Sequence, residues 1–469
     1  MQEIKKYIES FFFQNKIQIN SENTSLFENY LSDNIIVESV KIIKERQKIL
    51  MSNWELKNRI QDIILQPISL PNGTVNKKYE AKIDFIKFGW NDIVYYEIKD
   101  IEEIGFSFNK TKCILSGNPL ISGDLKFKIF FRINGEAEGS ALNEKEINII
   151  INPDPKSLWK NIESDVNDVF WKEDNVSISD RFVDKNIVVT SKRGRSHANI
   201  GSFREDDFAF KNFEKSGWSI ICVADGAGSA SLSRRGSYLA CNAIIKYFEE
   251  NFSTEHLNEF DKTLLNHHTN KDEESIKKIS HFVYNNLSKA AHFTHKEIEK
   301  EAFNSEKPLK DFHSTLIFAL VKKYDFGYAI LTFGVGDCPI GLLNKDLTEI
   351  KLMNWLDVGE YGGGTRFITM PEIFQSNKFS SRFGFKLVDD FSYLMLMTDG
   401  IYDPKFVVEA NLEKIEKWKE FIKDLKGNNE DNSIVEFKSE NLEIANQLSN
   451  WMNFWSPGNH DDRTLAIIY

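Results

Sequence analysis

Residues 219–226 read SIICVADG, a short apolar run that ends at an aspartate and a glycine. Such a run is typical of a buried β-strand, and the Asp-Gly pair is typical of a sharp turn at its end. A sheet holds the end of its strand in place, so a carboxylate at that position has a fixed location. Asp225 is therefore the first candidate for a functional site.

The same arrangement recurs along the C-terminal two-thirds of the chain. Four further acidic groups adjoin apolar strands: Glu205-Asp206-Asp207 before FAF, Gly336-Asp337 after AILTFGV, Asp399-Gly400 after YLMLMT, and Asp461-Asp462 before RTLAIIY. A single Asp-Gly pair is usually only a tight turn. Five such groups at strand ends are hard to explain as independent turns, and we expect them to converge on one edge of a sheet.

Converging carboxylates favour a particular kind of ligand. Like charges raise one another's pKa, and a divalent cation removes this conflict. Hard oxygen ligands without a cluster of cysteine or histidine favour Mg²⁺ or Mn²⁺ over zinc or copper. The glycines that follow Asp225 and Asp399 let the backbone turn sharply and expose a carbonyl.

Composition limits the other possibilities. The chain has 469 residues, a formal net charge of −11 and no long basic stretch, which disfavours a nucleic-acid or membrane partner. Its four cysteines form no CxxC pair, so we expect neither a zinc ribbon nor a disulfide framework. With no signal peptide and no apolar run long enough for a membrane span, the sequence predicts a cytoplasmic protein.

The N-terminal third changes period near residue 70. Apolar residues recur at helical spacing over 1–66, and Pro67, Pro71 and Asn72-Gly73 then break the pattern. Residues 75–153 alternate with period two, which predicts a small β-sandwich. The stretch GFSFNKTKCILSGNPLISGDLKFKIFF, residues 105–131, resembles bacterial immunoglobulin-like modules.

From residue 157 onward, apolar strands alternate with two long amphipathic helices, expected over about 231–252 and 274–303. This pattern favours sheets covered by helices. The segment 408–450, rich in Glu, Lys and Asn, is expected to be a surface insertion, and Gly362-Gly363-Gly364 a flap beside the site.

Seven motifs, in this order, resemble the metal-dependent protein phosphatase family, which has the protein phosphatase 2C-like fold, and in particular its compact bacterial branch. They are RGRSHANIGSFREDDFAF, IICVADGAGSA, FHSTLIFAL, TFGVGDCPIGLL, GEYGGGTRF, LMLMTDGIYD and HDDRTLAIIY. The resemblance implies an α+β fold, an αββα sandwich of two antiparallel sheets flanked by helices. We therefore expect three parts: a helical segment over 1–70, an immunoglobulin-like β-sandwich over 75–153 and the phosphatase-like domain over 157–469.

The resemblance also implies a hydrolase that uses two divalent cations, Mg²⁺ or Mn²⁺, and a weaker third. By motif position, Asp225 bridges both cations and the Gly226 carbonyl binds one. Asp399 and Asp461 each bind a cation, Asp206 with Glu205 beside it holds the other through water, and Asp337 matches the third site. Water activated by the cations then attacks phosphorus, without a phosphoenzyme.

Several positions depart from the family pattern. Ala227 stands where some members have a histidine that could act as general acid, and Asp462 adds a negative charge where Asp-Asn is usual. For the phosphate grip, the sequence offers His197 first and Arg204 second, with Arg193 and Arg195 as rivals. All four residues remain alternatives for binding the phosphate group.

The sequence therefore predicts a Mg²⁺/Mn²⁺-dependent phosphoserine/phosphothreonine phosphatase of bacterial signalling. Its expected partners are a phosphoprotein substrate and a cognate Ser/Thr kinase, with the N-terminal region used for docking or dimerisation. The alternative is a catalytically weak phosphatase-like module that binds phosphorylated partners. A two-metal phosphodiesterase or nuclease ranks third, because the chain is acidic and has no basic groove.

Overall fold

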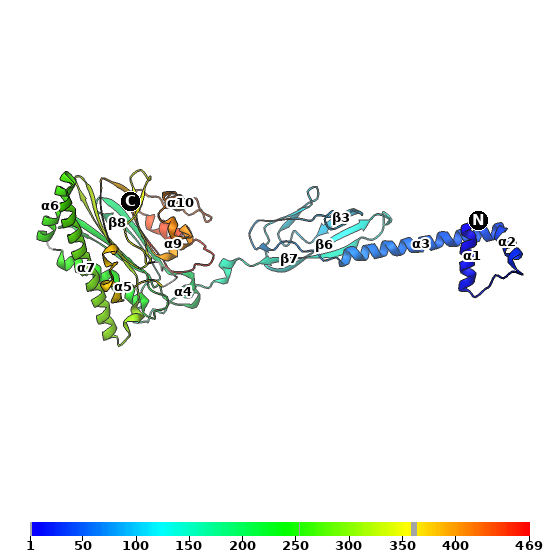
Figure 1. Cartoon of the computed structure of the whole chain (residues 1–469), viewed down its shortest axis with the longest axis horizontal. Helices are drawn as coiled ribbons and strands as arrows, with labels where there is room; N and C mark the ends of the chain where they lie inside the picture. The colour runs from blue at the N-terminus through cyan, green and yellow to red at the C-terminus, as the bar shows by residue number, and fades with distance from the viewer. Residues whose placement is uncertain (1, 253, 358–363) are drawn as a thin grey trace. The chain divides into compact units, whose positions relative to one another are not determined.

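The computed structural model describes residues 2–252, 254–357 and 364–469 of the chain. The chain divides into two compact units, Met1–Leu158 and Trp159–Tyr469 (Figure 1). Each unit has its own hydrophobic cores. Among the described residues, no helix is both long and apolar enough to cross a membrane.

Three helices begin the first unit: α1 (Gln2–Gln14), α2 (Thr24–Ser32) and α3 (Asn34–Leu65). The side chain of Asp33 accepts a hydrogen bond from the backbone N–H of Ile35 and so caps α3. A small core of Ile8, Phe27, Leu31 and Val40 holds the three helices together.

The rest of the first unit is rich in β-structure. Its strands are β1 (Gly73–Thr74), β2 (Tyr79–Lys82), β3 (Ile93–Lys99), β4 (Phe106–Asn109), β5 (Ile114–Gly117), β6 (Gly123–Ile133) and β7 (Asn143–Asn152). They form a four-stranded sheet, β1-β7-β6-β3, and a three-stranded sheet, β2-β5-β4. Alternate residues of β6 are buried from Phe127 onward, as the period-two pattern predicts, and Ile63 at the end of α3 lies in the same core.

Two antiparallel sheets form the centre of the second unit. The five-stranded sheet has the order β10-β11-β12-β13-β16, and the six-stranded sheet has the order β15-β14-β17-β18-β9-β8. The strands of the first are β10 (Asp207–Phe213), β11 (Trp218–Ala224), β12 (Leu316–Tyr324), β13 (Gly327–Val335) and β16 (Phe383–Val388). Those of the second are β8 (Asn175–Phe182), β9 (Lys185–Lys192), β14 (Ile340–Asn344), β15 (Ile350–Leu352), β17 (Phe391–Met397) and β18 (Arg463–Ile468).

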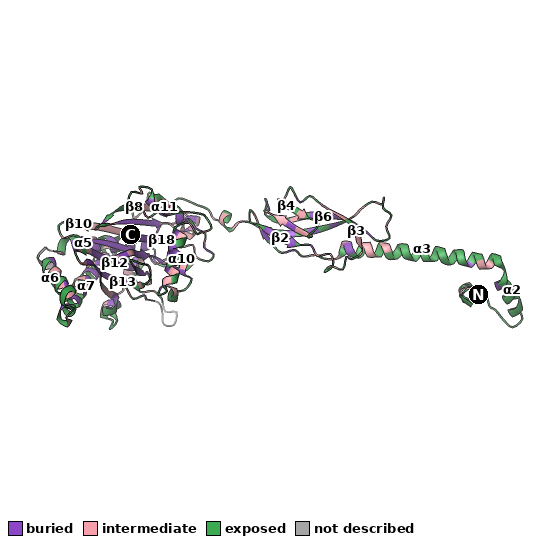
Figure 2. Ribbon diagram, turned by 90° about the horizontal axis from the view of Figure 1, so that it is seen from above, coloured by how far each residue is buried: buried purple, intermediate pink, exposed green. Residues whose placement is uncertain are grey.

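Helices cover the outer face of each sheet, and three apolar cores fill the layers. Helices α5 (Ser233–Asn251), α6 (Thr254–Asn270) and α7 (Glu273–Asn304) share a core with the five-stranded sheet. Helices α9 (Asp399–Phe406), α10 (Ile415–Leu425) and α11 (Ile444–Trp451) share one with the six-stranded sheet. The third core lies between the sheets, where buried strands cross the unit (Figure 2). The predicted αββα sandwich is confirmed.

The segment 408–450 differs from its expected role as a surface insertion. Its helix α10 buries Trp418, Phe421, Ile422 and Leu425 against the six-stranded sheet. These residues recur at i, i+3, i+4 and i+7, which is the helical spacing of a core-facing stripe. The many charged residues lie on the opposite side of the same helix and obscure this stripe in a count of composition.

Gly341 in β14 is a position where this packing leaves no room for a side chain. A Cβ atom at residue 341 would lie 2.3 Å from the ring of Trp418. We expect Gly341→Ala to destabilise the second unit by about 1–3 kcal/mol, because overpacking forces the indole or the strand to move. Urea unfolding followed by tryptophan fluorescence measures this change.

Gly364→Ala is the matched control, since a Cβ atom there meets nothing within 4 Å. Equal unfolding midpoints for the two variants would contradict the packing argument.

Candidate metal centre

The pairing of β10 with β11 brings two of the predicted aspartates together. Asp207 pairs with Ala224 at the end of this ladder, so Asp206 and Asp225 lie opposite each other one residue further on. Thr315 fixes Asp225 from the neighbouring strand. Its hydroxyl accepts from the Asp225 N–H at 2.9 Å, and its own N–H donates to the Asp225 carbonyl at 2.8 Å.

The second sheet contributes at the same edge of the sandwich. Thr398 directly follows β17, and Thr464 is the second residue of β18. Both hydroxyls donate to Oδ2 of Asp206 at 2.8 Å. Asp206 is buried, so these two bonds join the sheets at this edge. Asp399 comes directly after Thr398 and begins α9.

The carboxyl groups in this edge influence one another strongly. Burial raises the pKa of Asp225 well above its usual range, and neighbouring carboxylates raise it further. These neighbours are Asp399, Asp206, Asp461 and Asp337. Burial, with the charge of Asp462, also raises the pKa of Asp206 to about 7, although the two threonine hydroxyls favour its ionised form.

Gly226 lies where the backbone approaches Glu205. A Cβ atom at residue 226 would lie 2.7 Å from the Glu205 carbonyl oxygen, so only glycine fits. Gly226 also bridges to Ser314, through bonds made by the adjacent Asp225 carbonyl and Ala227 N–H. The Gly226 carbonyl takes no part in this pairing.

Glu205 supplies a further buried oxygen. Among the described residues, its buried Oε2 has no hydrogen-bond partner. Burial raises the pKa of Glu205 to about 7, with Asp462 and Asp461 adding to the effect of burial and His197 opposing it. A buried acceptor that makes no hydrogen bond and has only the more distant His197 Nε2, at 3.9 Å, as an ion-pair partner among the described residues fits, beside several mutually repelling carboxyl groups, a site for hard divalent cations.

Asp337 lies at the end of β13 on the same side. Its Oδ2 accepts a hydrogen bond from the Thr365 hydroxyl at 2.7 Å. Burial raises its pKa, and it is in turn one of the charges that act on Asp225 and Asp399. The preceding Gly336 is held by Asp357, whose carboxylate pairs with buried Arg382.

Sequence reasoning missed Asp403, which joins the same group. Asp403 lies four residues after Asp399 on α9, so both project from one face of that helix. Burial raises its pKa, and the charges of Asp337 and Asp461 add to this. The i, i+4 spacing within TDGIYD was the available signal.

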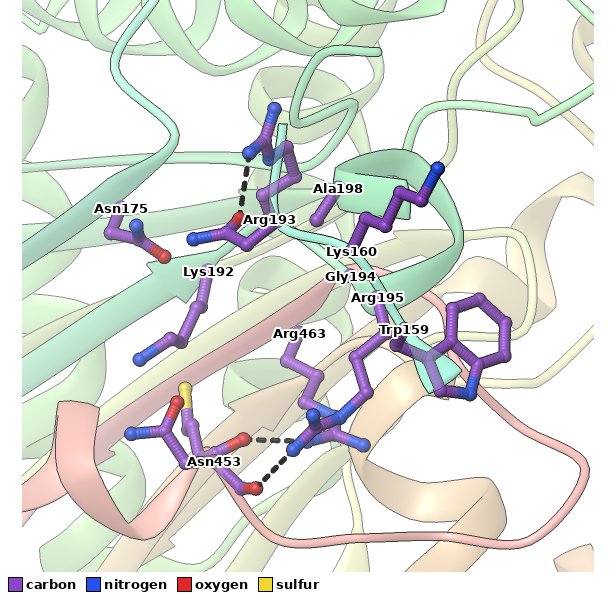
Figure 3. A pocket seen from close by; sticks show the side chains of 12 residues that line it. Trp159, Lys160, Asn175, Lys192, Arg193, Gly194, Arg195, Ala198, Asn453 and Arg463 are labelled. Carbon is purple, nitrogen blue, oxygen red and sulfur yellow. Dashed lines mark hydrogen bonds between the residues drawn. The ribbon is translucent and has the colours of Figure 1, made fainter. Parts of the chain in front are cut away.

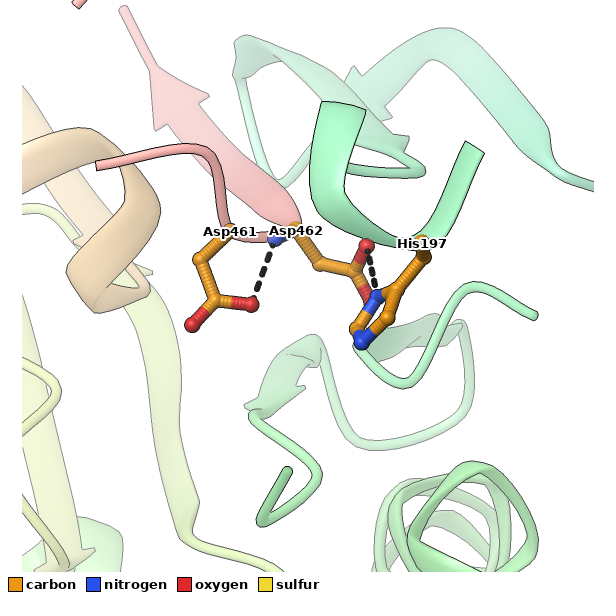
Figure 4. Close-up of side chains that lie close together, drawn as sticks. All are labelled: His197, Asp461 and Asp462. Atoms are coloured by element: carbon orange, nitrogen blue, oxygen red, sulfur yellow. Dashed lines mark hydrogen bonds and ion pairs between the residues drawn. The ribbon is translucent and has the colours of Figure 1, made fainter. Parts of the chain in front are cut away.

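Asp461 and Asp462 have different environments although they are adjacent (Figure 4). Oδ1 of Asp462 accepts from the Gly194 N–H at 2.5 Å and lies 2.9 Å from Nδ1 of His197, while Oδ2 accepts from the Glu205 N–H. Asp462 is buried and both of its oxygens are used. Asp461 is exposed and, within the described residues, accepts a hydrogen bond only from the Asp462 N–H, at 2.8 Å.

The extra negative charge at Asp462 has a partner in His197. His197, Asp461 and Asp462 each offer a potential ligand atom within 4.8 Å of the others. Burial disfavours the imidazolium form, but the hydrogen bond and charge of Asp462 outweigh this and raise the pKa of His197 to about 9. The pair Asp462–His197⁺ is therefore a structural ion pair at neutral pH, and the negative charge of Asp462 is compensated within the protein.

The two leading candidates for the phosphate grip have different surroundings. His197 stays partly exposed, with Nε2 at 3.9 Å from Glu205. Arg204 is buried, and its guanidinium donates to the Glu173 carbonyl at 2.9 Å, to Ser191 Oγ at 2.6 Å and to the Asp206 carbonyl. Arg204 is thus committed to holding the backbone of the site from inside.

Lys172 is a second residue that sequence reasoning missed. Its Nζ donates to the Asp206 carbonyl at 2.7 Å and to Asp207 Oδ2 at 3.0 Å. Burial lowers its pKa to about 8 despite the nearby carboxylates. Lys172 follows Val169, Phe170 and Trp171 in a segment that forms neither a helix nor a strand, so no periodic pattern marks it. The sequence also predicts a flap at Gly362-Gly363-Gly364. Gly362 and Gly363 lie outside the described residues.

Comparison with known families gives a match over most of the second unit. The sequence model of the family described as "Protein phosphatase 2C" matches residues 193–453, which is more than half of the chain. The chain belongs to the protein phosphatase 2C family. The matched residues include all five strands of the five-stranded sheet, β14, β15 and β17 of the six-stranded sheet, and the aspartates of the edge described above up to Asp403.

Solved structures that resemble this protein phosphatase 2C chain include bacterial enzymes. The serine/threonine phosphatase Stp1 from Staphylococcus aureus is 13% identical, with a TM-score of 0.36, over 60% of this chain and 93% of that one. The S. agalactiae serine/threonine phosphatase is 14% identical, with a TM-score of 0.35, over 62% and 99%. The catalytic domain of PstP, solved with 2 manganese ions, is 13% identical, with a TM-score of 0.36, over 63% and 97%. A comparison with curated proteins gives no match.

The raised carboxyl pKa values predict how stability of the metal-free phosphatase domain depends on pH. Asp225, Asp399 and Asp206 hold protons more tightly in the folded state than in the unfolded chain, where Asp ionises near pH 4. The folded state therefore binds more protons between about pH 4 and pH 7, so stability falls as pH rises through this range. Thermal unfolding in EDTA across that range measures the slope.

Asp225→Asn removes one of these charges and should flatten the slope, whereas Asp389→Asn, at an exposed position on the same unit, should leave it unchanged. A stability of the metal-free wild type that rises over this range would contradict the repulsion.

Proposed function

We propose that the chain is a Mg²⁺- or Mn²⁺-dependent phosphatase that hydrolyses phosphoserine and phosphothreonine in a phosphoprotein. The observation that carries the proposal is the convergence of Asp206, Asp225, Asp399 and Asp461 at one edge of the sandwich, where their charges conflict. Family membership supports the same reaction class. A cognate Ser/Thr kinase, the source of the substrate phosphate, is part of this proposal.

The residues of this edge would hold two divalent cations. Asp225 would contact both, with the Gly226 carbonyl, Asp399 and Asp461 as further ligands and Glu205 and Asp206 holding water ligands. Asp337, with Asp403 nearby, would serve a weaker third cation. Bound cations would supply the Lewis acidity that turns water into a nucleophile near neutral pH and would neutralise phosphoryl oxygens.

Threonine side chains of the protein would position the residues that hold the cations. The Thr398 and Thr464 hydroxyls orient Asp206 and favour its ionised form, and Thr315 holds the backbone of Asp225. Of the proposed phosphate ligands, we retain His197, because it is charged at neutral pH and partly exposed beside the carboxylates. We do not retain Arg204, whose donors are directed at protein oxygens.

Hydrolysis of p-nitrophenyl phosphate and of a phosphoserine peptide in Mn²⁺ tests the activity. Asp225→Asn should lower kcat/KM by at least about 100-fold, since even residues that only orient metal ligands cost up to that factor. Asp389→Asn is the control and should keep wild-type rates. An inactive wild type, or equal rates in wild type and Asp225→Asn, would refute the phosphatase proposal.

Ala227 supports a second candidate function, a phosphatase-like module that binds phosphorylated partners with little turnover. The position offers no proton donor to the leaving oxygen, and the Ala227 N–H is already bonded to the His313 carbonyl. Calorimetry with Mn²⁺ and a phosphoserine peptide separates the two candidates. Rapid turnover eliminates the binding module, and saturable binding without turnover supports it.

We also propose that the N-terminal unit is an arm for docking or dimerisation. Between its two cores, α3 exposes large apolar side chains, which include Ile35, Ile42, Ile49, Leu50 and Trp54. The first three are seven residues apart, the spacing of a helix face that pairs with another helix.

Deletion of residues 1–155 should leave hydrolysis of p-nitrophenyl phosphate within about twofold of the full chain, because the catalytic unit has its own cores. Light scattering should show a smaller assembly if the arm dimerises. Complete loss of activity in a truncated protein that still unfolds cooperatively would show that the arm contributes to catalysis.

A further inference from the structure

A second site in the C-terminal unit has the opposite charge from the metal centre. It is a cavity of about 310 Å³ whose lining includes Trp159, Lys192, Arg193, Arg195, Asn453 and Arg463 (Figure 3). We call this cavity the basic pocket. Four of these six side chains are cationic, in a chain whose net charge is −11.

The basic pocket and the metal centre lie on opposite faces of the six-stranded sheet. Successive side chains of a strand point to opposite faces. In β18, Thr464 bonds to Asp206 in the metal centre, while Leu465 packs in the outer core with α10 and α11. Arg463 shares the outer face with Leu465, and it donates to the carbonyls of Met452 and Phe454 beside α11.

Two of the cations face each other directly. Arg463 in β18 pairs in register with Lys192 in β9. Like charges directly opposite in an antiparallel pair destabilise a sheet. Burial, together with the charges of Arg463 and Arg195, lowers the pKa of Lys192 to about 8. Burial also lowers the pKa of Arg463, to about 10, with Arg195 adding to the effect.

Among the described residues, an acidic side chain pairs with one of these four cations and leaves the other three without an acidic partner. Arg193 pairs with Asp174 at 3.1 Å. Within 2–252, 254–357 and 364–469, however, no carboxylate forms an ion pair with Lys192, Arg195 or Arg463, and these residues donate hydrogen bonds to neutral oxygens.

Arg463 also keeps an unused donor. Its Nε is buried and has no hydrogen-bond partner within the described part of the chain, although the residue is only 5% exposed. An unpartnered buried donor in a repelling group of cations indicates an anion that completes the site.

We propose that the basic pocket binds a diphosphate group, as free pyrophosphate or as part of a nucleotide. Arginine and lysine side chains that line one cavity suit phosphate oxygens, which accept several charge-assisted hydrogen bonds at once. The volume is at the lower end for small-ligand sites, which fits a diphosphate more closely than a bulky ligand. Trp159, whose ring contacts the ring of His460, also lines the cavity and would lie beside the base of a bound nucleotide (Figure 3).

Calorimetry on the full chain in EDTA tests this site without interference from the metal centre, because carboxylates without cations repel phosphate. Inorganic pyrophosphate, ADP and a phosphoserine peptide are titrated separately. We expect saturable binding of pyrophosphate or ADP, and tighter binding of ADP would identify the nucleotide as the source of the diphosphate. Binding of the phosphoserine peptide alone, or of none of the three, would overturn the proposal.

The double variant Lys192→Gln/Arg195→Gln should weaken this binding by at least about tenfold, the loss expected for one or more charge-assisted hydrogen bonds. The control Lys215→Gln/Lys386→Gln removes the same charge from exposed positions and should bind as wild type does. Equal affinity in the two double variants would overturn the proposal.

Thermal unfolding gives a second readout and checks folding. Pyrophosphate should raise the unfolding temperature of the wild type and the control but not that of the double variant. The single variant Lys192→Gln removes one of two opposed like charges, so it should fold in EDTA and still lose pyrophosphate stabilisation. Full stabilisation of Lys192→Gln by pyrophosphate would place the anion elsewhere.

Discussion

The buried carboxylate of Asp206 is the point on which the catalytic unit depends. Asp206 directly precedes β10 of the five-stranded sheet. It accepts hydrogen bonds from Thr398 and Thr464 on the side of the six-stranded sheet. A buried carboxylate is costly unless it is bonded or neutralised, so these two hydroxyls fix how the sheets meet. The sandwich is therefore held together at the place where its acidic residues are concentrated.

Backbone pairing places those acidic residues, and their own charges oppose the placement. Asp225, Asp399 and Asp337 each follow a strand whose pairing is complete up to the preceding residues. The free energy of the apolar cores keeps the strands in register against the repulsion at their ends. The same six-stranded sheet separates acidic groups on one face from basic groups on the other, and the sequence Asp461-Asp462-Arg463 supplies both.

Local sequence patterns predicted the strands, the long helices and the acidic residues beside them, because each pattern reflects a single element and its burial. The period-two and period-3.6 patterns are visible in β6 and α7 without knowledge of the fold. They could not show that Asp462 and His197, 265 residues apart, would form an ion pair. They also could not assign Lys172, whose role comes only from carbonyls and carboxylates of distant segments.

The expectation for 408–450 was wrong for a different reason. Composition averages the two sides of α10 and so hides the stripe that Trp418 and Phe421 form. Arg204 was the second candidate for the phosphate grip, and its place immediately before Glu205 could not decide its role, because only side-chain contacts distinguish a residue that faces a substrate from one that supports the backbone.

The placement of Cys338 has a consequence for chemical resistance. This residue follows Asp337, is fully buried and contacts Thr315, and burial with the nearby aspartates raises its thiol pKa well above the usual range. Burial does the same for Cys222 and Cys241. Peroxides and alkylating reagents attack the thiolate, so all three will react slowly. A unit whose proposed chemistry uses oxygen ligands, and whose three buried thiols are kept protonated, should therefore tolerate oxidising conditions that inactivate cysteine-dependent enzymes.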